Sequence, residues 1–145
     1  CHFWTGINKA LYGESVGILK MLTSLSKIEE HLKKTAEIDP GYAEAGAWRV
    51  LGVINQKVPS IFGGSRNEAI KDFRKAIHLV PREPMNYLFL ARVLMDDEES
   101  KPEALKVTRA AIQQPVPSYE YVESLEARRE VEELNRELES QTGPQ

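Results

Sequence analysis

A spacing of small and large apolar residues in the middle of the chain most constrains its fold. The residues that carry it are Trp48, Leu51, Gly52 and Asn55, followed after a loop by Ala69, Phe73, Ala76 and Pro81. Apart from Pro81, the members of each set lie on one face of a helix, because they recur three, four and seven residues apart. Gly52 lets a second helix approach closely, and Pro81 ends that helix because proline has no N–H to donate. The spacing predicts a tight helix hairpin over residues 45–81.

Weaker copies of this pattern lie on both sides of the central hairpin. The first comprises Trp4, Ile7, Asn8 and Leu11 with Ile28, Leu32, Thr35 and Pro40, and the third comprises Tyr87, Leu90, Ala91 and Leu94 with Ala104, Thr108, Ala111 and Pro115. Self-similarity of this kind is typical of tetratricopeptide (TPR) repeats, which stack into superhelices. We therefore predict an all-α, TPR-like superhelix of three helix pairs and a C-terminal capping helix.

The predicted boundaries place one domain at 1–140, with hairpins at about 1–40, 41–82 and 83–115 and the cap helix at about 118–140. Residues 141–145 are expected to form a frayed tail. Three Ser-x-x-Glu capping boxes, at 26–29, 65–68 and 100–103, predict the starts of the second helices. Residues 13–24 are expected to add a helical turn or lengthen a helix, and residues 57–64 to form a loop.

The last helix carries only a thin apolar stripe, as expected for a terminal cap whose outer face must be solvated. The stripe consists of Val122, Leu125, Val131, Leu134 and Leu138.

Composition narrows the possible functions. A net charge of -3 argues against a nucleic-acid-binding role, which normally needs a basic patch. The single cysteine excludes an internal disulfide, and no apolar run approaches the ~20 residues of a membrane span. The chain starts in helical periodicity without an initiator Met, so we interpret it as a segment of a longer protein. A lipidated Cys1 is the less favoured alternative.

The sequence gives little support for catalysis. Its three histidines, His2, His31 and His78, fall on different predicted helices, and none has a Cys or His partner at metal-ligand spacing. Gly63-Gly64 is a lone pair in a loop, unlike the glycine-rich turn that cradles phosphate after a strand. We predict no enzyme activity, no cofactor and no metal site, and we interpret the histidines as ordinary helix-face residues.

The helical register suggests a concave binding groove along the first helix of each pair. Its expected lining is His2, Thr5, Lys9 and Tyr12, then Gly46, Arg49, Val53 and Gln56, then Met85, Leu88, Arg92 and Met95. Cationic side chains among apolar ones could hold a carboxylate and an apolar chain, so a small apolar or acidic ligand or a peptide terminus is the candidate. The alternative is that these charges are simply solvated on exposed helix faces.

Two further surfaces are candidates for contact with a partner. The loop Ile61-Phe62-Gly63-Gly64 places two large apolar residues beside two glycines, which favours a protein interface. Alternatively, both side chains fold back under the hairpin and the glycines only form the turn. The stripe of Phe3, Trp4, Ile7 and Leu11 on the first helix predicts either self-association or an additional N-terminal segment.

Several local patterns resemble one particular branch of TPR proteins. They are His2-Phe3-Trp4, Gly17-Ile18, Ile28-x-x-His31-Leu32 leading to Glu37-Ile38-Asp39-Pro40, and Phe62-Gly63-Gly64-Ser65 ahead of Ala69 and Phe73. Together they resemble the TatT-like T-components associated with tripartite ATP-independent periplasmic (TRAP) transporters. A more distant similarity is to the regulators of microtubule dynamics. The double-glycine loop favours the TatT-like group.

This resemblance implies a non-catalytic periplasmic or membrane-anchored lipoprotein. Such a protein would dock the substrate-binding subunit of a transporter and would hold or pass a small apolar anion. The chain departs from the pattern in having no lipobox and no upstream helices, which leaves its compartment and ligand open. The alternative function is a generic TPR scaffold that clamps a peptide or protein partner and has no role in transport.

Overall fold

The computed structural model describes residues 2–5, 18–115 and 122–142, and every regular element in these ranges is helical. After a helical turn at residues 2–5, the elements are α2 (Ile18–Ile38), α3 (Tyr42–Lys57), η1 (Ser60–Phe62), α4 (Arg66–Leu79), α5 (Pro84–Met95), η2 (Glu98–Ser100), α6 (Lys101–Gln113) and α7 (Val122–Thr142). The predicted all-α fold is confirmed.

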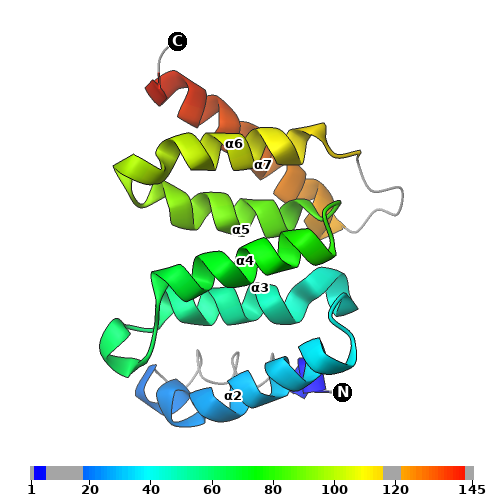
Figure 1. Ribbon diagram of the computed structural model, residues 1–145, viewed down its shortest axis with the longest axis vertical. Helices are drawn as coiled ribbons and strands as arrows, with labels where there is room; N and C mark the ends of the chain where they lie inside the picture. The colour runs from blue at the N-terminus through cyan, green and yellow to red at the C-terminus, as the bar shows by residue number, and fades with distance from the viewer. Residues whose placement is uncertain (1, 6–17, 116–121, 143–145) are drawn as a thin grey trace.

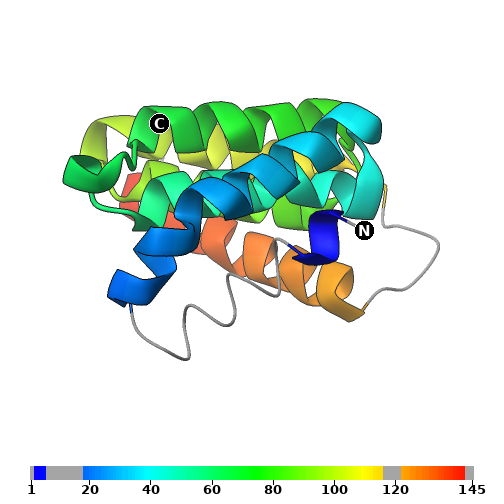
Figure 2. The ribbon, with the colours of Figure 1, turned by 90° about the horizontal axis from the view of Figure 1, so that it is seen from below.

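The helices stack as successive antiparallel hairpins. From α2 to α6, each helix packs against the next one along the chain, and the stack runs along the long axis of the molecule (Figure 1). The last helix, α7, packs against both α5 and α6 and crosses behind them. Seen from below, α7 and α4 lie on opposite sides of the array (Figure 2). This helix therefore closes the end of the array and also covers part of α5.

The central hairpin has the close approach that its sequence predicts. A Cβ atom built on Gly52 of α3 would lie 2.5 Å from Cε1 of Phe73 on α4, so only glycine fits at this crossing. Ala69 and Ala76, on either side of Phe73, are fully buried. Phe73 also stacks on Phe89 of α5, with ring centroids 5.7 Å apart. The same residue thus joins the α3–α4 hairpin to α5.

The capping signals are only partly confirmed. The Ser65 hydroxyl accepts a hydrogen bond from the Glu68 N–H at 3.3 Å and caps α4 as predicted. Ser26 does not cap, because α2 begins at Ile18 and places this serine inside the helix. The extra residues from Ile18 onward, which lie within the described ranges, therefore lengthen the helix. Ser100 lies at the N-cap position of α6, but its hydroxyl donates to Asp97 Oδ2 at 2.8 Å and makes no capping bond.

The cap helix α7 confirms two of the expected apolar contacts and corrects one. Val131 and Leu138 are buried, whereas Val122, at the start of the helix, is 63% exposed. Buried Asn135 accepts a hydrogen bond from the Thr108 hydroxyl of α6 at 2.9 Å. The stripe is therefore thinner in apolar residues than predicted and is completed by a polar contact.

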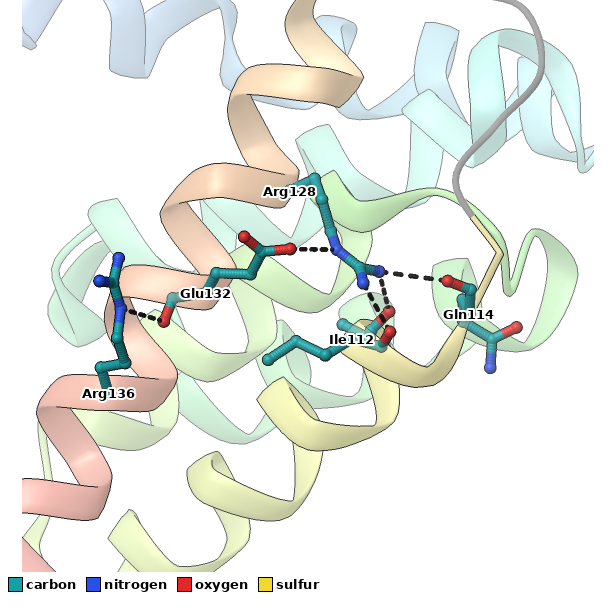
Figure 3. A network of polar contacts seen from close by, with 6 residues as sticks. Ile112, Gln114, Arg128, Glu132 and Arg136 are labelled. Carbon is teal, nitrogen blue, oxygen red and sulfur yellow. Dashed lines mark hydrogen bonds and ion pairs between the residues drawn. The ribbon is translucent and has the colours of Figure 1, made fainter.

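Arg128 of α7 closes the C-terminal end of α6 (Figure 3). Its Nη1 donates to the carbonyl oxygens of Ala111 and Gln114 at 2.6 and 3.2 Å, and Nη2 donates to that of Ile112 at 2.5 Å. Its Nε donates to Glu132 one turn further along α7 at 2.9 Å. A cation at a helix C-terminus satisfies carbonyls that have no partner within the helix and complements the helix dipole.

The start of α3 contains a left-handed turn. Ala43, Glu44 and Ala45 have φ values of 51°, 54° and 60°, although none of them is glycine. This region is disfavoured by roughly 1–2 kcal/mol per residue for side chains with a Cβ. The turn persists only if the surrounding contacts offset that strain, and the polar contacts that do so are described below.

Candidate functional site

The loop between α3 and α4 is held by an almost continuous set of backbone hydrogen bonds. The N–H groups of Val58, Phe62, Gly63, Gly64 and Ser65 donate to carbonyls within the loop or at the end of α3, over distances of 2.8 to 3.2 Å. A backbone satisfied in this way has little freedom to rearrange. The loop is a fixed structure at the edge of the array (Figure 1).

Both glycines of this loop are required by its geometry. Gly63 has φ of 96°, a left-handed conformation that side chains rarely adopt. A Cβ built on Gly64 would lie 1.7 Å from the Val58 carbonyl oxygen, which no rearrangement of side chains could relieve. The glycine pair therefore shapes the tip and presses the loop backbone against itself.

The tip of the loop presents two large apolar side chains to solvent. Ile61 is 83% exposed and Phe62 is 51% exposed. The alternative interpretation, in which both fold back under the hairpin, is therefore wrong. Exposed apolar residues on a pre-organised loop are a feature of protein interfaces, because association then removes apolar surface without ordering the backbone.

The expected concave groove is only partly available. Lys9 and Tyr12 lie outside the described residues. Gly46 is buried under the Phe3 ring, so the prediction that it faces the groove is wrong. Val53 packs against the central core, and Gln56 is half-buried on the last turn of α3.

Arg49, the proposed anion-binding residue of α3, is engaged inside the protein. Its Nη1 donates to the Asn86 side-chain oxygen at 2.7 Å and to the Glu44 carbonyl at 3.1 Å. Burial lowers the pKa of Arg49, and the nearby carboxylates of Glu83 and Glu44 oppose that shift. The hydrogen bonds of the guanidinium thus connect the start of α3 to α5.

Asn86 of α5 is the centre of this network, and no pattern in the sequence predicted this role. The amide nitrogen of this buried residue donates to the carbonyl oxygens of Glu44, Ala76 and Val80, at 3.3, 3.3 and 3.4 Å. It thereby joins the left-handed turn of α3 to the end of α4. These contacts, together with those of Arg49, offset the strain at Ala43–Ala45.

A second buried polar pair joins α5 to α7. The Glu83 carboxylate accepts from the Met85 N–H at 3.0 Å and caps α5, and its other oxygen accepts from the Ser124 hydroxyl at 2.8 Å. An N-cap carboxylate followed by proline is a typical helix start, and Glu83-Pro84 was not among the helix starts predicted from the capping boxes.

The groove residues on α5 lie beneath α7 or beside it. Leu88 is buried, and Met85 and Met95 are partly buried against the core clusters. Arg92 is exposed but forms an ion pair with Glu130 of α7. The cleft there has a volume of about 210 Å³ and is lined by Leu88, Arg92, Glu130, Glu133, Leu134 and Glu137. Three carboxylates against one guanidinium disfavour an anionic ligand at this point.

A shallow apolar hollow of about 360 Å³ lies on the side of α5 that faces α4 and α6. It is lined by Arg74, Ile77, Tyr87, Leu90, Glu103, Lys106, Val107 and Ala110. Arg74 of α4 and Glu103 of α6 form an ion pair across its rim. None of its lining residues belongs to the groove that the helical register predicted.

The N-terminal turn packs inward, contrary to one expectation. Phe3 is 6% exposed and packs with the α2–α3 core, so it does not belong to an outward stripe. Trp4 is 55% exposed, while Ile7 and Leu11 lie outside the described residues. The turn also brings His2 to His31 of α2, with their Nδ1 atoms 2.9 Å apart. The two histidines are 29 residues apart in the sequence, so no local spacing predicts this contact.

The family model for the TRAP transporter T-component matches residues 3–140. The chain belongs to this family. The T-component is an accessory part of a transport system, which gives this protein its general functional class. No curated protein matches the sequence.

Membership is consistent with the patterns on which the resemblance rested, since the matched segment includes the double-glycine loop and the central hairpin. None of the helices in the described ranges of this T-component is long and apolar enough to cross a membrane.

Proposed function

We propose that this T-component docks a partner subunit of its transporter through the α3–α4 loop. The observation that carries this proposal is the exposure of Ile61 and Phe62 on a loop whose backbone is already satisfied. Among the subunits of such a transporter, we propose the substrate-binding subunit as the partner. A periplasmic location, with any membrane anchor outside the described residues, belongs to the same proposal.

The energetics of such a contact favour the loop over the groove. Fully burying an aliphatic or aromatic side chain contributes ~1.5–3 kcal/mol, and a pre-organised loop loses little conformational entropy on binding. Two such residues can form the centre of an interface, where a few side chains supply most of the affinity.

The hypothesis of a small apolar anion in the concave groove receives less support. Arg49 is engaged by Asn86 and Glu44, and Arg92 is paired with Glu130 in a cleft rich in carboxylates. We therefore assign docking, and not ligand carriage by these residues, as the primary function.

The test measures binding of the purified chain to the substrate-binding subunit of the same transporter. The double substitution Ile61→Ser with Phe62→Ser should weaken binding by at least about 2 kcal/mol, because truncating central apolar contacts has this effect. The matched control is Ile38→Ser. Ile38 is the last residue of α2, at the corner with α3, and it is also strongly exposed. Circular dichroism should show that both variants remain helical.

Unchanged affinity of the loop variant would remove the loop from the interface. Loss of binding in the Ile38→Ser control alone would move the interface to the α2–α3 corner. If the wild-type chain does not bind that subunit but does bind short peptides, the generic scaffold function would replace the docking proposal.

A further inference from the structure

The apolar hollow over α5 is a surface that the proposed contact through the α3–α4 loop does not involve. Its apolar walls come from α4, α5 and α6 and consist of Ile77, Tyr87, Leu90, Val107 and Ala110. Tyr87 and Leu90 are buried and form its floor, whereas the residues from α4 and α6 are only half-buried. Apolar side chains are therefore accessible over a volume of about 360 Å³.

The shape of the hollow suits side chains of a larger partner better than a free small molecule. Arg74 and Glu103 form an ion pair across one end, and from Glu103 to Ala110 the hollow follows α6 for about 10 Å, at 1.5 Å per residue. A site for a small ligand typically encloses about 70–90% of the ligand surface, which a shallow hollow of this length does not. One or two apolar side chains fit into it while the rest of their protein lies outside.

The charges that remain unpaired beside the hollow are positive. Lys106 belongs to its lining, is exposed, and forms no ion pair with any described residue. Arg82 is also exposed and without an ion pair in the described ranges, and it directly follows Pro81, whose carbonyl oxygen accepts a hydrogen bond from the Tyr87 hydroxyl at 2.9 Å. Arg82 is therefore close to the Tyr87 end of the hollow. The carboxylate of the lining, Glu103, is already engaged in the ion pair at the other end.

We propose that the apolar hollow binds an acidic segment of a protein partner. The segment inserts one or two aliphatic or aromatic side chains between α4 and α6 and places carboxylates beside Lys106 and Arg82. Burial of the apolar side chains supplies the affinity, and complementary charge selects the partner. The cleft between α5 and α7, with its three carboxylates, would repel the same segment, so charge directs it to the hollow.

The experiment adds the synthetic peptide acetyl-EELFEE-amide to the full chain labelled with 15N and follows the backbone amides by two-dimensional NMR up to millimolar peptide. We expect saturable shifts at Ile77, Val107 and Ala110, which line the hollow. The matched peptide acetyl-KKLFKK-amide has the same apolar centre and the opposite charge, and it should bind at least about tenfold more weakly. Added salt should weaken the binding of the acidic peptide, because it screens exposed charges.

Two substitutions separate the charge from the apolar contact. Lys106→Glu should weaken binding of the acidic peptide about threefold to tenfold, because it replaces an attraction at the rim with a repulsion. Lys27→Glu is the matched control, since it makes the same change in net charge at an exposed lysine of α2, and its affinity should equal that of the wild type. Ala110→Phe should weaken binding at least about tenfold, because the added ring occupies the hollow. Circular dichroism should show that all three variants remain helical.

The location of the shifts and the effect of Lys106→Glu decide the proposal. Saturable shifts at the hollow that are lost in Ala110→Phe would support it. The absence of saturable shifts there, equal binding of the two peptides, or unchanged affinity in Lys106→Glu would overturn it, as would shifts confined to the α3–α4 loop. The variant with Ile61→Ser and Phe62→Ser should bind the acidic peptide as the wild type does, so this result and the test of the α3–α4 loop are independent.

Discussion

The corners at the two ends of α3 both contain residues with positive φ, but the residue types differ. At the α3–α4 corner, Gly63 supplies the positive φ and Gly64 the close approach. At the α2–α3 corner, Ala43, Glu44 and Ala45 adopt positive φ values without any glycine. Only the first corner avoids the steric conflict between a Cβ and the carbonyl oxygen that follows it.

The difference teaches where each corner's stability resides. The glycine corner is stable through its own backbone hydrogen bonds, so its side chains Ile61 and Phe62 are free to face solvent. The strained corner depends on Arg49 and Asn86, which reach it from outside and are thereby engaged. The side chains of a corner that is stable by itself are available to bind a partner. At a corner that depends on its neighbours, the contacting side chains are needed to stabilise the fold.

The largest expected effect comes from adding a methyl group at the glycine corner. Gly64→Ala would place a Cβ 1.7 Å from the Val58 carbonyl oxygen and should reduce the free energy of unfolding by roughly 3 kcal/mol or more. Gly41→Ala is the matched control at the other corner, because its Cβ would meet only Asp39 Oδ1 at 3.7 Å. Its effect should stay within about 0.5 kcal/mol in urea denaturation. Similar losses in both variants would contradict the contrast between the corners.

A smaller effect of opposite sign is expected at the strained corner. Glu44→Gly should raise the free energy of unfolding by about 0.5–1 kcal/mol, because removing the Cβ relieves the left-handed strain by more than the added chain entropy opposes. The matched control is Glu133→Gly in the right-handed α7, which should lose about 1 kcal/mol. If thermal melts show that both glycines destabilise equally, the turn at residues 43–45 is not left-handed in solution.

The smallest effect concerns a carboxylate that buttresses the glycine corner. The Asn55 carbonyl accepts from the Ser65 N–H at 2.8 Å, and its side-chain nitrogen donates to Asp72 Oδ2 at 2.9 Å. Burial raises the pKa of Asp72, while the hydrogen bond from Asn55 lowers it. The folded state therefore holds the Asp72 proton more firmly than the unfolded chain does, and this group's contribution to stability decreases as pH rises through its titration.

Asp72→Asn removes that titration and can keep the bond from Asn55. Asp72 is partly open to solvent, so screening should limit the gain in stability of the variant to less than about 0.5 kcal/mol at neutral pH. The gain should vanish near pH 3, where wild-type Asp72 is protonated as well. Urea titrations at both pH values measure it, and a variant less stable than the wild type at neutral pH would show that the carboxylate itself is favourable.

The sequence predicted what depends on local periodicity. The helix type, the Gly52–Phe73 approach and the Ser65 cap follow from spacing within one hairpin, where neighbouring residues fix the geometry. The cap at Ser26 was predicted wrongly because a serine caps only where the preceding residues are not helical, and α2 begins earlier. At the third box, the Ser100 hydroxyl donates a hydrogen bond to Asp97 and makes no capping bond.

The candidate site was less predictable because long-range contacts decide it. A helical register places Arg49 and Arg92 on one side of their helices but does not say what covers them. Asn86 lies 37 residues from Arg49, and Glu130 lies 38 residues from Arg92. The meeting of His2 with His31 and the burial of Phe3 depend on how the first turn settles on the array, and no pattern within either segment specifies it.

The contacts of Arg128 also affect where additional helices could be inserted into this array. Repeat proteins commonly gain or lose units by duplication, since each unit meets only its neighbours. Here the final carbonyls of α6 are satisfied by a residue 14 to 17 positions downstream, on the terminal helix. A duplicated hairpin inserted between α6 and α7 would carry Arg128 away and leave the old helix end open. An insertion between α6 and α7 that moved Arg128 away would therefore remove these contacts from the end of α6.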